Sequence, residues 1–93
     1  MPAFLITYDL NSPGQDYSKL HDAIKAQSSE NLWWHYLDST WIIVSNGTAG
    51  SVRDALMATI DTNDKLLVIK VGPGGWGTAN MPEKANQWLK NNV

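Results

Sequence analysis

Apolar side chains recur at two different spacings along residues 1–71, and the order of these spacings constrains the fold more than any other feature of the sequence. Residues 3–9 (AFLITYD) are rich in aromatic and β-branched types and are followed by turn formers. After Asp16, which suits a helix N-cap, apolar residues such as Leu20 and Ile24 recur every three to four positions. These patterns predict a strand over 3–9 and a helix over 16–28.

The middle of the sequence predicts a hairpin, a second helix and a fourth strand. Strand-forming residues lie on both sides of the turn-forming pair Asp38 and Ser39. Thr48 suits an N-cap for a helix whose apolar residues repeat every four positions, and KLLVIKV alternates in the manner of a strand. The predicted elements are strands over 32–37 and 40–45, a helix over 48–60 and a strand over 65–71.

The resulting order, βαββαβ, predicts an α+β ferredoxin-like fold, in which two helices cover one face of a four-stranded antiparallel sheet. Right-handed crossovers are expected to place the first and fourth strands at the centre and the second and third on the flanks. Residues 1–71 would form this core. Residues 72–93 would add a glycine-rich connection and a short C-terminal helix beginning at Pro82, within the same single domain.

The glycine-rich segment GPGGWG, residues 72–77, has the glycine spacing of a dinucleotide-binding motif. That motif must open a helix and precede an acidic residue about 20 positions later within a βαβ unit, and this context is missing. We therefore expect the segment to act as a hinge that lets the tail cross to a partner chain.

Chain length and aromatic content indicate a homodimer. A domain of 93 residues has little core volume, and three of its five tryptophans, Trp33, Trp34 and Trp41, lie within nine residues of one another. Because neighbours on a strand point to opposite faces, Trp33 and Trp34 are expected on opposite sides of the sheet. One would lie under the helices and the other on the open face, where a partner chain would cover it.

Charge and cysteine content restrict the class of protein. The net charge is -2, and the basic residues are scattered, which disfavours avid binding to nucleic acid without sequence preference. The absence of cysteine excludes disulfides and thiolate metal sites. The sequence has neither the features of an export signal nor a long apolar run, so the expected location is the cytoplasm, with no membrane partner.

Asp9 is the leading candidate for a metal ligand. It follows an apolar strand at the edge of a loop, and Mg²⁺ prefers oxygen ligands while keeping several waters. Two chains related by a two-fold axis would bring two Asp9 carboxylates together. The alternative is that Asp9 forms an Asx-turn with Asn11 and Ser12.

The two histidines have no neighbouring metal-ligand partners in the sequence. His21 lies beside the apolar stripe of the first helix, which indicates a residue at the boundary of the core. His35 alternates away from Trp34 and Tyr36, so it would face the other side of the sheet and is a candidate general acid or base. Asp61 and Asp64 are expected to be turn residues.

Three segments in combination, LITYDLN, WWHYLDSTWIIVS and LLVIKV, resemble the ferredoxin-like superfamily of CRISPR-associated protein 2 and the VapD-type ribonuclease toxins. The longer segments TYDLNSPGQDYSKLHDAIK and IDTNDKLLVIKV are similar to the SinR-like family of bacteria and phages. The resemblance covers residues 4–71. It implies a homodimer and places Asp9, preceded by Tyr8, at the position of the metal ligand in the nuclease members.

The sequence supports two functions. The first is a metal-dependent endoribonuclease or phosphodiesterase that uses Mg²⁺ or Mn²⁺ on Asp9, with Tyr8 or His35 orienting phosphate or assisting proton transfer. The second is a non-catalytic dimeric module in a phage or defence context that binds nucleic acid, a nucleotide or a protein, in which Asp9 only shapes the loop.

Overall fold

The computed structural model describes residues 1–11 and 17–93 and is of the α+β class. Its elements are β1 (Ala3–Asp9), α1 (Ser18–Gln27), the 3₁₀ turn η1 (Ser29–Asn31), β2 (Trp33–Leu37), β3 (Thr40–Val44), α2 (Ala49–Met57), β4 (Lys65–Val71) and α3 (Glu83–Asn92). Strands 3–9 and 65–71 have the predicted bounds, and the other predicted elements are present with ends that differ by a few residues.

The four strands form one antiparallel sheet in the order β2-β3-β1-β4. The expectation that strands one and four are central is therefore wrong, because β1 and β3 are central and β4 is an edge. The helical crossover from β1 to β2 leaves a gap between them, which β3 fills when it folds back from β2. The crossover from β3 to β4 likewise passes over β1. This arrangement is compatible with a ferredoxin-like architecture.

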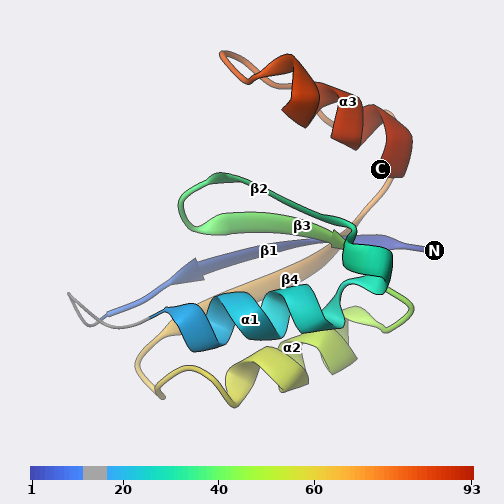
Figure 1. Ribbon diagram of the computed structural model, residues 1–93. Helices are drawn as coiled ribbons and strands as arrows, with labels where there is room; N and C mark the ends of the chain where they lie inside the picture. The colour runs from blue at the N-terminus through green and yellow to red at the C-terminus, as the bar shows by residue number, and fades with distance from the viewer. Residues whose placement is uncertain (12–16) are drawn as a thin grey trace.

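The main core lies between the sheet and the helices α1 and α2, which occupy one side of the sheet in Figure 1. Alternate residues of β1 point into this core, because side chains of a strand alternate between faces. Its fully buried members include Phe4, Ile6, Leu20, Ile24, Trp41, Ile43, Val52 and Leu56. Trp41 is the largest of them.

A second core lies on the opposite face of the sheet, under α3 (Figure 1). It joins Ala3, Trp34 and Ile42 of the sheet to Ala85 and Leu89 of α3. The indole Nε1–H of Trp34 donates a hydrogen bond to the carbonyl oxygen of Ala85 at 3.2 Å. The tail therefore packs on the open face of its own sheet, where the sequence pattern predicts cover by a partner chain.

Trp33 and Trp34 lie on opposite faces, which confirms the prediction from strand alternation. Trp33 packs beside the core under α1, with the Lys25 ammonium 4.9 Å from its ring centroid, and Trp34 is buried under α3. Strand β2 is therefore packed on both faces although it is an edge strand. Trp33 packs on the side of α1, and Trp34 packs against α3.

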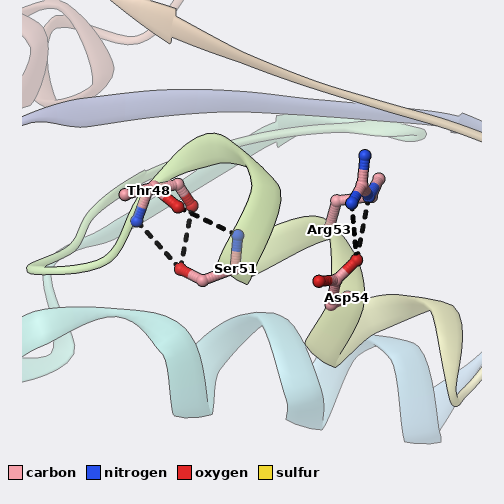
Figure 2. Close-up of polar contacts among 4 residues, drawn as sticks. All are labelled: Thr48, Ser51, Arg53 and Asp54. Atoms are coloured by element: carbon pink, nitrogen blue, oxygen red, sulfur yellow. Dashed lines mark hydrogen bonds and ion pairs between the residues drawn. The ribbon is translucent and has the colours of Figure 1, made fainter.

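Local sequence signals set the start of α2. The hydroxyl of Thr48 accepts from the N–H of Ser51, and the hydroxyl of Ser51 accepts from the N–H of Thr48, which forms the capping box drawn in Figure 2. This confirms Thr48 as the N-cap. Next to it, the exposed side chains of Arg53 and Asp54 form an ion pair with 2.7 Å between the guanidinium nitrogen and the carboxylate oxygen.

The ends of the other helices differ slightly from the predictions. The expected cap of the first helix, Asp16, lies outside the described residues, and Tyr17 stands at the N-cap of α1. Pro82 occupies the N-cap of α3 rather than its first position. Among residues 1–11 and 17–93, no helix has the length and apolar character needed to cross a bilayer.

Candidate functional site

Asp9 lies at the exposed end of β1, opposite Lys65 of the edge strand β4. Beside it opens a pocket of about 400 Å³. The pocket is lined by Tyr8, Asp9, Leu10, Tyr17, His21, Asp38 and Ser39. The end of β1, the start of α1 and the tip of the hairpin between β2 and β3 thus meet around one polar opening.

The tip of this hairpin is fixed to β1 by one backbone and one side-chain hydrogen bond. The N–H of Tyr8 donates to the carbonyl oxygen of Ser39 at 3.2 Å, and the Thr7 hydroxyl donates to the same oxygen. The backbone bond from Tyr8 continues the pairing of β1 with β3 past Thr40, the first residue of β3. As a result, the carbonyl group of Asp38 lies next to the ring of Tyr8.

The phenolic oxygen of Tyr8 is the centre of a hydrogen-bond network. It accepts from the indole Nε1–H of Trp41 at 3.2 Å and lies 3.0 Å from Nε2 of His21 and 3.3 Å from the carbonyl oxygen of Asp38. Tyr8 is buried apart from 8% of its surface. Its side chain therefore holds β1, α1 and the hairpin together from inside the protein.

The proton of Tyr8 can take either of two positions. A phenol has one proton, so Tyr8 donates either to His21 or to Asp38. If it donates to Asp38, Nε2 of His21 carries a proton and donates to Tyr8 in return. The orientation of the Tyr8 hydroxyl is thereby coupled to which nitrogen of the His21 ring carries a proton.

His35 supports this network from the neighbouring strand. Its ring stacks on Trp41 with centroids 3.9 Å apart and an interplanar angle of 13°, and it lies edge-on to His21 at 5.4 Å. Its Nε2–H donates to the carbonyl oxygen of Asp38 at 3.1 Å. His35 faces away from the Trp34 and Tyr36 pair, as predicted, but it contributes to the network rather than to the lining of the pocket.

Burial shifts the ionisation of both linked side chains. It raises the pKa of Tyr8 above its ordinary value. The hydrogen bond from Trp41 lowers this pKa, and the nearby Asp38 raises it. Because the net shift is upward, the phenol stays protonated near neutral pH. Burial also lowers the pKa of His21 below its ordinary value of 6.5, helped by His35 and Lys25. His21 is therefore mainly neutral at pH 7 and can accept a proton.

The Asx-turn proposed for Asp9 finds no support at Asn11. The backbone N–H of Asn11 donates to Oδ1 of Asp64 at 2.8 Å, whereas an Asx-turn from Asp9 would use this N–H. The other candidate partner, Ser12, lies outside the described residues. Asp64 also accepts from the N–H of Asp61, so its carboxylate joins the exit of β1 to the turn before β4. This confirms the predicted turn role of Asp61 and Asp64.

Asp9 is an isolated candidate for metal binding within one chain. In the part of the chain that the structure describes, His, Asp and Glu side chains form no cluster of three or more that would hold a metal ion. A Mg²⁺ ion needs only one or two protein carboxylates because it keeps several waters. The exposed carboxylate of Asp9 suits that mode of binding, and a second carboxylate would have to come from another chain.

The structure brings Tyr8 and Asp9 to one pocket and adds His21, for which the sequence predicts only a place at the boundary of the core. The available signal was its spacing, since His21 lies four residues after Tyr17 and three before Ile24 on the buried side of α1. That spacing does not reveal which strand residue the imidazole meets.

No protein-family model matches the chain, and no solved structure gives a significant match to it.

Proposed function

We propose that this protein is a cytoplasmic, ferredoxin-like homodimer related to CRISPR-associated protein 2, and that it acts as a metal-dependent endoribonuclease or phosphodiesterase. The observation that carries the proposal is the pocket at the end of β1, where the exposed Asp9 carboxylate lies beside the hydrogen-bonded pair Tyr8 and His21. A concave site with convergent polar groups and shifted pKa values is where catalysis is expected.

In this proposal Asp9 binds Mg²⁺ or Mn²⁺, and Asp9 of the second protomer completes the site. The ion, when bound, would activate water and neutralise charge on the phosphate. Neutral His21, in the tautomer whose Nε2–H donates to Tyr8, would accept a proton from the nucleophile at Nδ1. Tyr8 acts as a positioning residue, because its hydroxyl is buried and holds the imidazole.

His35 receives a supporting role instead of direct contact with substrate. Its stacking on Trp41 and its bond to the Asp38 carbonyl group fix the wall on which Tyr8 and His21 rest. Replacement of His35 should therefore weaken activity less than replacement of Asp9 or His21.

Cleavage assays on purified protein test this function. RNA, single-stranded DNA and duplex DNA are incubated with Mg²⁺ or Mn²⁺, and Asp9→Asn is expected to abolish cleavage, since the amide keeps the shape of the side chain but loses its charge. Asp54→Asn, an exposed carboxylate on α2, serves as the matched control and should keep full activity. Absence of metal-dependent cleavage on all three substrates by the unsubstituted protein would refute the enzyme.

A second candidate is a non-catalytic dimeric module that binds nucleic acid, a nucleotide or a protein. The specific observation in its favour is that the Tyr8 hydroxyl is engaged by Trp41, His21 and Asp38 at once, as in a network that stabilises a fold. For this candidate, oligonucleotide binding would survive Asp9→Asn without any cleavage. The net charge of -2 predicts few phosphate contacts and so a shallow dependence of affinity on salt.

A further inference from the structure

A second pocket lies on the other face of the sheet, away from Asp9. It has a volume of about 420 Å³ and lies, partly open to solvent, between the open sheet face and the segment that follows Val71. Its principal walls are Leu5, Trp34, Ile42 and Val71 on the sheet side and Trp76 and Leu89 on the tail side. This volume lies within the range of about 300–1,000 Å³ that is typical of small-molecule sites.

The chemistry of the walls selects a neutral ligand. Of the residues that the structure describes, those lining this pocket include no Asp, Glu, Lys, Arg or His side chain. The hydroxyl of Thr40 is hydrogen-bonded to Thr7, and that of Thr78 donates to Asn86. A charged ligand would lose its hydration without a compensating partner, whereas an apolar one would gain from burial.

The two indole walls differ in how firmly they are held. Trp34 is 3% exposed and is fixed by its bond to Ala85, whereas Trp76 is 37% exposed and belongs to neither buried core. Trp76 stands among glycines, of which Gly74 has a φ of 78° that favours glycine, and a Cβ added at Gly74 or Gly77 would meet no neighbouring atom. The Trp76 part of the tail side can therefore adjust around a ligand without breaking core contacts, whereas Leu89 is held in the second core.

A small molecule fits this pocket better than a protein partner. Helix α3 and the segment before it already cover this part of the sheet, so a second sheet cannot lie flat on it. Two tryptophans among the walls favour a planar aromatic ligand, because aromatic pairs add a specific attraction to the burial of apolar area. We propose that the pocket between the open sheet face and α3 is a binding site for a small, neutral, aromatic molecule.

Titration calorimetry with indole tests the site, with hexanol as a non-aromatic probe of comparable hydrophobicity. We expect indole to bind at one site per chain with a dissociation constant of about 1 mM or tighter and hexanol at least about tenfold more weakly. Val71→Phe, which fills the pocket, should weaken indole binding at least about tenfold. Leu67→Phe adds the same ring to the same face of β4 outside this pocket and should leave binding unchanged.

Trp76→Ala provides a second variant whose folding is not in question, because its side chain is partly exposed and outside both cores. It should also weaken indole binding, with an unchanged melting temperature. Failure of the unsubstituted protein to bind indole, or equal loss of binding in Leu67→Phe and Val71→Phe, would overturn the site. Equal affinity for hexanol would overturn its aromatic preference.

Discussion

The hydroxyl of Tyr8 lies 3.0 Å from Nε2 of His21, and this hydrogen bond joins strand β1 to helix α1 at the mouth of the pocket that contains Asp9. The same oxygen accepts from the fully buried Trp41. The bond therefore connects the candidate site directly to the main core, so changes at either residue should affect both stability and the geometry of the pocket.

Removal of the Tyr8 hydroxyl should destabilise the fold. Tyr8→Phe keeps the ring but leaves the indole N–H of Trp41 buried without its acceptor, which is expected to cost about 1–3 kcal/mol. Urea unfolding followed by tryptophan fluorescence measures this difference. Tyr36→Phe removes a hydroxyl from a residue that is 40% exposed and should stay within about 0.5 kcal/mol of the unsubstituted protein. Equal effects of the two substitutions would argue against the Tyr8 network.

Protonation of His21 should make stability depend on pH below neutrality. Its pKa is lowered in the folded state by burial and by His35 and Lys25, so the unfolded chain takes up the proton first as the pH falls. The contribution of neutral His21 to the free energy of unfolding is therefore fully present above the unfolded pKa of about 6.5. It is lost as the pH falls from there through the lower pKa of the folded state. Melting temperatures between about pH 5 and pH 8 measure this loss.

His21→Gln is the control for this dependence, since glutamine cannot titrate. In this variant, which keeps His35, the melting temperature should depend less on pH below about 6.5. A proton NMR titration that places the pKa of His21 above that of a histidine in the unfolded chain would contradict the predicted direction.

The carboxylate of Asp64 should contribute more to the stability of the fold than an average surface charge does. It accepts from the backbone N–H groups of Asn11 and Asp61, and Asp64→Ala should cost about 0.5–1.5 kcal/mol, because both exposed N–H groups lose this acceptor and bond to water instead. Asp54→Ala breaks only the exposed pair with Arg53 and should change stability by less than about 0.5 kcal/mol. Denaturant unfolding of both variants compares them, and a smaller effect at Asp64 would refute the bridging role.

Truncation of Leu89 should loosen α3 without unfolding the rest of the protein. Leu89 is 3% exposed in the core on the open sheet face, and Leu89→Ala should cost about 2–5 kcal/mol of docking free energy. Hydrogen exchange should become faster in α3 while the amides of α1 and α2 keep their protection. Leu67→Ala, at a position 53% exposed, is the control, and uniform loss of protection in Leu89→Ala would show that α3 does not open by itself.

Local patterns in the sequence determined the elements of this protein. The strands at 3–9 and 65–71, the Thr48 cap and the opposite orientations of Trp33 and Trp34 follow from residue type and spacing over a few positions. These features depend on neighbours along the chain, and for that reason the sequence alone is sufficient to predict them.

Only the tertiary structure decided the order of the strands, the partner of His21 and the destination of α3. The position of β3 between β1 and β2 depends on where the helical crossovers return to the sheet, and the meeting of Tyr8 with His21 depends on how α1 lies across it. The glycines after Val71 leave the direction of the tail open, and the burial of Trp34 by Ala85 and Leu89 selects it. Each of these outcomes is a contact between segments that are distant in the sequence. The spacing of residues within one segment shows which face is apolar but does not identify the segment that packs on that face.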